Sequence, residues 1–302
     1  MFVKTLLWRL LLIFSHQFKF MQPRLLTLSA LLLFSTAVIA QQTKKDTVFF
    51  EDFNAKALDR SKWNVEITGN TVNDEQQAYI DNGTTISTVK GKIEGATNGA
   101  LVLKALYKAG HTSAEGKKYD FVSGRINTRD KIMFTYGSAS ARIKVAGGEG
   151  LWPAFWALGN GEWPDCGEID VMETVGDASW TSNALHGPGY FGNTPLVYRA
   201  TFPKGIDATQ WHVYSVDWTA DSIIFKIDGK VTYTVTKQMV EKYGKWAFDN
   251  PKFLILNFAL GGGYPNGVNK ITKPYFGLSQ AAVDKIKAGK ANVYLDWVLI
   301  TK

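Results

Sequence analysis

Residues 163–173 read WPDCGEIDVME, a stretch in which carboxylates alternate with apolar side chains. Successive side chains of a β-strand point to opposite faces of the sheet, so Glu168 and Asp170 share one face while the apolar residues between them face a core. In a regular strand, Glu173 would fall on the apolar face. We therefore predict a β-bulge around Val171-Met172, whose extra residue returns Glu173 to the face of the other two carboxylates.

Several other segments show the same period of two, which is typical of strands with one buried face. Alternating apolar residues lead up to Asp228-Gly229 and away from it, and this pair favours a two-residue hairpin turn. Helical patterns are few, and they predict short helices only near 237–243 and 279–287. Many short strands separated by turn residues favour an all-β fold, a sandwich or jelly roll of two antiparallel sheets.

The first forty residues have the pattern of a targeting segment. Basic residues punctuate apolar runs, and the stretch ends in Val38-Ile39-Ala40, as signal peptides do. Met21 is an alternative start, because the residues after it form a complete signal peptide by themselves. The apolar run after Arg24 is interrupted by Ser and Thr and is shorter than the ~20 residues of a spanning helix. We expect residues 1–40 to be removed and the product to be secreted, periplasmic or at the cell surface.

Charge and cysteine content restrict the remaining possibilities. The 302-residue chain has a formal net charge of +7, but the targeting segment holds four of its basic residues and no acidic one, which leaves +3 on residues 41–302. This small excess gives little reason to expect a nucleic-acid partner, which would need clustered basic residues. The length fits a single β domain, 41–302. The single cysteine, Cys166, excludes an intramolecular disulfide and a zinc site built on several thiolates.

Three carboxylates on one face of a strand predict acid–base chemistry. Their mutual repulsion should raise at least one pKa and leave a protonated acid near neutral pH. Retaining glycoside hydrolysis needs one ionised carboxylate and one protonated acid about 5 to 5.5 Å apart, and Glu168, Asp170 and Glu173 could supply them. The alternative is a calcium site, although calcium loops favour Gly, Asn and carbonyl ligands over a β-run of Ile and Val.

Aromatic residues around the acidic strand could bind a sugar. Trp152 and Trp156 share one face of a predicted strand and could form a platform for pyranose rings, or they could be ordinary core residues. Trp163 lies in loop-like sequence and is predicted to be an exposed contact. His186 follows in a turn-rich stretch, where it is either a site residue or a structural one. Arg142 lies in a predicted strand and could face the same cleft or solvent.

The chain resembles glycoside hydrolase family sixteen, in its laminarinase-like branch. The resemblance rests on the E-I-D-x-x-E signature at 168–173, on HGPGY at 186–190, on 150–159 and 253–262, and on Asp296-Trp297, and it covers nearly the whole domain. It implies a concanavalin-like β-jelly roll with a concave substrate cleft and a retaining mechanism. In that mechanism Glu168 would be the nucleophile, Asp170 its assistant and Glu173 the acid/base.

The resemblance also implies roles for residues outside the acidic strand. Substrate-binding residues expected near the cleft, together with the exposed Trp163, are Trp152, Trp156, Arg142, His186 and Asn257. No cofactor would be required for catalysis. A structural calcium ion is expected on the convex side, held by Glu51 in an early strand and Asp296 in the last one.

The resemblance favours an endo-acting hydrolase of β-1,3 or mixed β-1,3/1,4 glucans such as laminarin, acting as a monomer. One alternative is an agarase or carrageenase of the same family, which Arg199 and Lys204 would permit. Another is a noncatalytic glucan-binding module, which the intact acidic trio argues against. Two departures from the family pattern leave the subsites open, because Ser140 stands where many relatives have Glu and Ala78 where an aromatic is common.

Overall fold

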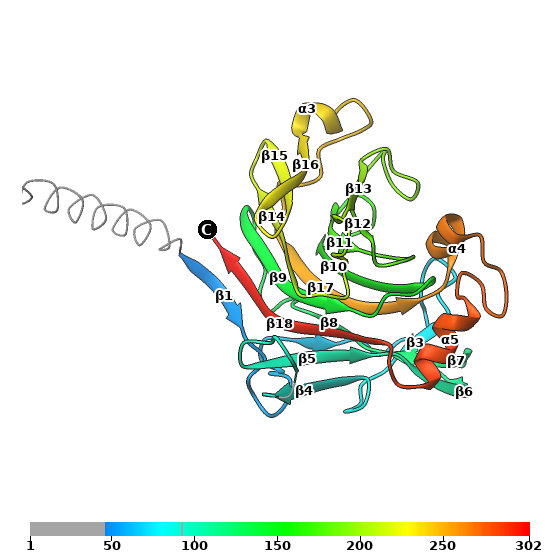
Figure 1. The fold of residues 1–302 in the computed structure, drawn as a ribbon. Coiled ribbons are helices and arrows are strands. Elements are labelled where there is room, and N and C mark those ends of the chain that lie inside the picture. Colours follow the sequence, from blue (N-terminus) through cyan, green and yellow to red (C-terminus); the bar gives the residue numbers. More distant parts are fainter. Residues whose placement is uncertain (1–45, 92) are drawn as a thin grey trace, which may run out of the picture. The chain divides into compact units, whose positions relative to one another are not determined.

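The computed structural model describes residues 46–91 and 93–302, so the predicted targeting segment lies outside the described residues. The chain divides into Met1–Thr47 and a compact unit, Val48–Lys302. Within the part that is described, no helix combines the length and the apolar character needed to cross a membrane. Strands are the main secondary structure of the compact unit, as predicted (Figure 1).

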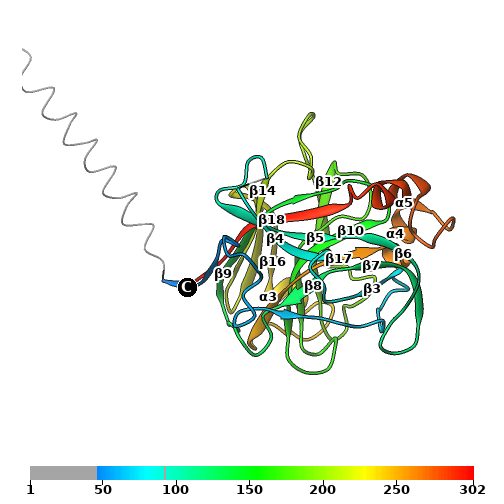
Figure 2. The same ribbon diagram turned by 90° about the horizontal axis from the view of Figure 1, so that it is seen from below.

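Two antiparallel sheets form most of this unit (Figure 2). One has the order β16 (Lys230–Thr236), β15 (Ser222–Ile227), β14 (His212–Trp218), β9 (Gly137–Val145), β18 (Asn292–Thr301), β5 (Gly99–Lys104) and β4 (Ile86–Lys90), with β1 (Thr47–Glu51) also paired to β18. The other has the order β13 (Val197–Thr201), β12 (Trp180–His186), β11 (Glu168–Glu173), β10 (Leu151–Gly159), β17 (Lys252–Leu260), β8 (Arg125–Asn127) and β2 (Asn64–Val65). A small third sheet joins β3 (Gln77–Tyr79), β7 (Lys118–Ser123) and β6 (Leu106–Thr112).

The inner faces of the two larger sheets share one hydrophobic core. Burial alternates along β9 and β14, whereas all nine residues of β17 are buried at the centre of its sheet. Trp218 is 1% exposed and donates its indole N–H to the Phe248 carbonyl at 2.9 Å. Each fully buried large apolar side chain contributes about 1.5–3 kcal/mol, so this core carries most of the stability.

The predicted hairpin and both predicted helices are confirmed, although the first helix ends at Val240 and not near Tyr243. Asp228 and Gly229 have φ values of 50° and 78°, as a primed turn requires, and they join β15 to β16. The side chains of Thr236 and Ser279 cap α3 (Lys237–Val240) and α5 (Gln280–Lys287). A third helix, α4 (Gly263–Asn269), has no side-chain cap and contains Gly and Pro, so its sequence reads as a loop.

The predicted bulge in β11 is also confirmed. Against β12, Asp170 lies opposite Ala184 and Glu173 opposite Ser182, so β11 uses one more residue than its partner. Against β10 the pairing likewise skips Val171. The carbonyl of Val171 accepts the side-chain N–H of buried Asn183 at 2.7 Å. A neighbouring side chain therefore replaces a ladder hydrogen bond that the bulge removes.

We predict that Asn183→Ala destabilises the fold by about 1–3 kcal/mol, because the buried Val171 carbonyl then lacks a donor. Thermal unfolding followed by circular dichroism measures the effect as a lower Tm. Asn98→Ala is the matched control, since exposed Asn98 makes only a 3.4 Å hydrogen bond to Asp52. Equal Tm values for the two variants would contradict a structural role for Asn183.

Candidate active site

The bulge brings the three carboxylates of β11 to one face of the second sheet. Glu168 lies opposite Leu158, Asp170 opposite Trp156 and Glu173 opposite Ala154 on β10. All six of these side chains line one cleft, with a volume of about 590 Å³. The remaining lining residues are Glu66, Ile67, Thr68, Asn70, Val72, Asn73, Glu75, Arg125, Trp152, Trp163, Asn257 and Ala259.

Burial raises the pKa of all three carboxyl groups. It brings the pKa of Glu168 to about 8, where the charge of Asp170 adds to the effect, and that of Glu173 to about 7. The pKa of Asp170 lies well above its usual range, because of burial first and the charge of Glu173 second. The site therefore holds protonated acids close to neutral pH.

Two indole N–H groups donate to the two glutamates. Trp163 Nε1 lies 2.8 Å from Glu168 Oε2, and Trp152 Nε1 lies 2.9 Å from Glu173 Oε1. Both bonds favour the ionised carboxylates and oppose the effect of burial on their pKa values. Each tryptophan thus fixes the rotamer of one carboxylate while its ring lines the cleft.

His186 lies beside the acidic residues at the end of β12. Its Nε2 is 3.3 Å from Asp170 Oδ2 and 4.0 Å from Glu168 Oε1. The His186 side chain is only 13% exposed and lies against these acidic residues, although it is not among the side chains that line the cleft. Of the two sequence interpretations, the structure supports a position in the site.

The wall next to β10 contains polar residues that sequence analysis missed. The guanidinium of Arg125 lies 5.0 Å from the Trp156 ring centre and forms an ion pair with Glu66. Arg125 belongs to the SGR motif at 123–125, a signal that could have identified it.

A hydrogen-bonded chain runs behind this wall. Trp156 Nε1 donates to Asn257 Oδ1 at 2.8 Å, and Asn257 Nδ2 lies 3.1 Å from the hydroxyl of Tyr79. That hydroxyl donates to Glu75 at 3.2 Å. Asn257 therefore orients Trp156 while its own side chain borders the cleft.

The rim beside Glu168 is aromatic. Trp163 is 47% exposed, as predicted, and its ring packs edge-on against Phe191 at 5.4 Å between centroids. Phe191 is 51% exposed and was also missed, since nothing in its local sequence separates it from other loop residues. Two exposed rings next to a buried carboxylate give the cleft an apolar edge suited to a sugar face.

The assignment of Arg142 to the cleft is wrong. Arg142 lies on β9 of the other sheet, where its guanidinium forms an ion pair with buried Asp296 and donates to the Gly95 carbonyl at 2.7 Å. It also lies 4.9 Å from the Trp211 ring centre. Strand periodicity fixes which face a side chain takes, but not which sheet contains the strand.

The ion pair between Arg142 and Asp296 also involves one of the two residues of the expected calcium site. Both oxygens of Asp296 accept hydrogen bonds from Thr97, and one of them also meets Arg142. Glu51 accepts from the Phe53 amide and pairs with Lys62 at 3.0 Å. Positively charged side chains therefore already neutralise both carboxylates, and this arrangement does not fit an open calcium site.

One further group could offer metal ligands. Atoms of Glu168, Asp170 and His186 all lie within 4.8 Å of one another. The Trp163 N–H points at Glu168, however, and such a donor favours an anionic carboxylate that accepts hydrogen bonds. We interpret the cluster as acid–base machinery.

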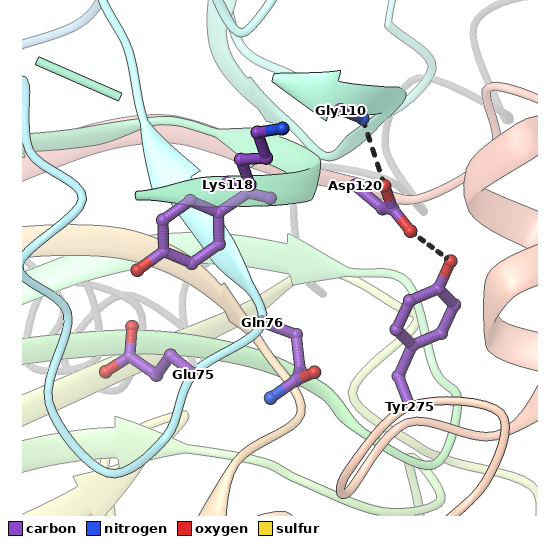
Figure 3. A pocket seen from close by; sticks show the side chains of 7 residues that line it. Glu75, Gln76, Gly110, Lys118, Asp120 and Tyr275 are labelled. Atoms are coloured by element: carbon purple, nitrogen blue, oxygen red, sulfur yellow. Dashed lines mark hydrogen bonds between the residues drawn. The ribbon is translucent and has the colours of Figure 1, made fainter. Parts of the chain in front are cut away.

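A smaller polar pocket of about 390 Å³ adjoins the cleft through Glu75, which lines both (Figure 3). Asp120 lies on one side of it, where its two oxygens accept from the Gly110 amide at 3.0 Å and the Tyr275 hydroxyl at 2.8 Å. Both oxygens of Asp120 are thus engaged within the protein, which indicates a structural link between β7 and the loop at Tyr275.

Comparison with known proteins identifies the family. Residues 60–273 match the sequence model of glycosyl hydrolases family 16. The chain is 33% identical over 240 residues to glucan endo-1,3-beta-glucosidase A1 of Niallia circulans, covering 73% of this chain and 34% of that protein. It is 29% identical over 256 residues to a beta-glucanase of Rhodothermus marinus, covering 80% and 84% of the two chains.

Solved structures agree with this result. The crystal structure of the laminarinase catalytic domain from Thermotoga maritima superimposes with a TM-score of 0.69 at 29% identity, covering 85% of this chain and 98% of that one. The β-sandwich, the acidic cleft and the matched residues lead to one conclusion: this chain belongs to glycosyl hydrolases family 16.

Proposed function

We propose that this protein is a retaining endo-glycosidase that cleaves internal β-1,3 or mixed β-1,3/1,4 linkages of a glucan such as laminarin. One observation carries the proposal: the bulge of β11 sets two glutamates on one cleft floor, and a different tryptophan donates to each. The named activities of the similar proteins support the choice of a glucan.

The first step would use both glutamates. The Glu168 carboxylate attacks the anomeric carbon while Glu173 gives its proton to the glycosidic oxygen, so the bond to the leaving sugar breaks and a glycosyl ester forms on Glu168. Water then attacks the same carbon, its proton passes to Glu173, and the ester bond breaks. The second step restores both groups to their starting protonation states.

Asp170 would keep the nucleophile ionised. Burial raises the pKa of Asp170 well above its usual range and so favours its protonated form. A protonated Asp170 removes a negative charge from beside Glu168, which favours the ionised nucleophile, and the Trp163 N–H also stabilises that charge.

The cleft residues would bind the glucan. Trp152, Trp156 and Trp163 offer rings for sugar faces, and His186 and Asn257 offer polar groups near the reacting carbon. We further propose that residues 1–40 direct secretion and that the enzyme acts as a monomer without a cofactor. A calcium ion on Glu51 and Asp296 is not part of the proposal, because cationic side chains already pair with both.

We expect rapid release of reducing ends from laminarin, slower release from lichenan, and none from agarose or κ-carrageenan. Glu168→Gln should lower hydrolysis by on the order of 10³-fold or more, because a carboxamide cannot form the glycosyl ester, while oligosaccharide binding survives. Reducing-end assays and isothermal titration calorimetry measure the two effects. Activity confined to a galactan would reassign the substrate, and full hydrolysis by Glu168→Gln would refute the mechanism.

The rate of laminarin hydrolysis should have a bell-shaped pH dependence. It depends on an ionised Glu168 and a protonated Glu173, so it falls on both sides of the pH range in which the two states coexist. Because burial raises the pKa of Glu168 to about 8 and that of Glu173 to about 7, we expect a narrow bell with its maximum between pH 7 and 8. A profile of kcat/KM between pH 4 and 10 tests this, and activity that stays constant to pH 10 would exclude Glu173 as the acid.

Glu173 should also make the protein less stable at high pH. Its folded-state pKa, about 7, is above the ordinary value of 4.5, so the folded state binds its proton more tightly than the unfolded state does. Stability from this group is therefore present at low pH and is lost as the pH rises from about 4.5 through 7. We expect Glu173→Gln to have a higher Tm than wild type at pH 8 and a similar Tm at pH 4. A gain at pH 4 alone would contradict this.

A further inference from the structure

Lys252, the first residue of β17, is fully buried. Asn257 and Ala259 on the same strand line the cleft, so by the period of two Lys252 points to the opposite, inner side of the sheet. Lysine is almost never fully buried unless it is paired. Among the residues that the structure describes, no carboxylate lies within 4.0 Å of its ammonium group. The charge must therefore be stabilised in another way.

Neutral oxygens and aromatic rings surround this ammonium group. Nζ donates to the Cys166 carbonyl at 2.9 Å, to the Ala247 carbonyl at 3.2 Å and to Asn250 Oδ1 at 2.7 Å. These three bonds use all of its donors. The ring centres of Trp218 and Phe248 lie at 5.7 Å and 5.3 Å, within cation–π range.

The contacts join two loops directly behind the acidic strand. Cys166 is two residues before Glu168, and its carbonyl also accepts the side-chain N–H of Asn250 at 3.0 Å. Gly167 has a φ of 70°, and a Cβ atom there would lie 2.1 Å from the Ala247 carbonyl oxygen. The backbone just before β11 therefore packs closely against residues 247–250, and the Lys252 ammonium group binds to both segments.

We propose that Lys252 is a positioning residue for Glu168: its buried ammonium group holds Cys166 against residues 247–250 and fixes the backbone from which Glu168 projects into the cleft. The inference rests on the proposed role of Glu168 as nucleophile. A charged donor suits this task, because hydrogen bonds from an ion are stronger than those from a neutral group.

The charges around Lys252 determine how it responds to pH. Burial lowers its pKa to about 8, and the Cys166 thiol, Asp249 and Glu168 oppose that shift. The amine is therefore mostly protonated at neutral pH. Because Glu168 stabilises the cation, the cation must in turn favour ionised Glu168, so its removal should raise the pKa of Glu168.

The test compares Lys252→Met with wild type on laminarin. We expect kcat to fall about tenfold while KM stays within about twofold, since a small displacement of a reacting group slows chemistry more than it weakens binding. The maximum of the pH profile should move to higher pH. A 2-deoxy-2-fluoro glucosyl fluoride extended by one β-1,3-linked glucose should label Glu168 more slowly, as measured by mass spectrometry.

Two further variants make the result decisive. Lys131→Met is the matched control, because Lys131 also donates to a backbone carbonyl, that of Trp63 at 2.9 Å, but contacts neither loop. Lys252→Gln retains a neutral donor. If Lys252→Met does not fold, Lys252→Gln should still show the shifted pH maximum and slower labelling.

Wild-type kcat, pH profile and labelling rate in a folded Lys252 variant would overturn the proposal. A kcat that falls only in step with Tm would overturn it as well, because a purely structural residue would behave in that way. The proposed function fails separately, through full hydrolysis by Glu168→Gln, so the two failures can be told apart.

Discussion

The single extra residue in β11 is the constraint on which the site depends. A regular strand would bury Glu173 among the apolar residues of the core, where an ionisable group is costly. The bulge at Val171 turns it to the cleft instead, and Asn183 supplies the hydrogen bond that the displaced carbonyl needs. Catalytic geometry and a satisfied backbone therefore come from the same irregularity.

Burial of three carboxyl groups on one face works against stability, and the surrounding residues limit its cost. Indole N–H groups from Trp152 and Trp163 and the imidazole of His186 lie against these carboxyl groups. The raised pKa of Asp170 favours its protonated form, which lowers the total negative charge. Burial, with the remaining repulsion, raises the pKa values that glycoside hydrolysis requires, so part of the stability of the fold is exchanged for reactivity.

Much of the fold was predictable because it rests on local patterns. Alternating residues identified the strands, Asp228-Gly229 the hairpin turn, and two short helical patterns the helices α3 and α5. The helix α4 was not predictable, since it lacks a capping side chain and its conformation depends on packing, including a bond from Asn269 to the Val175 carbonyl at 2.7 Å. Local propensity is only a weak guide where tertiary contacts decide the structure.

The sequence by itself determined the spacing of Glu168, Asp170 and Glu173, and with it the bulge, because the period of a strand is fixed by backbone geometry. It also determined that Trp152 and Trp156 share a face. Only the tertiary structure decided that Arg142 pairs with Asp296 outside the cleft, that Arg125 lines the cleft, and that Phe191 packs against Trp163 at its rim. Those contacts join residues far apart in the chain, and their partners depend on the order of strands in the sheets, which no local pattern encodes.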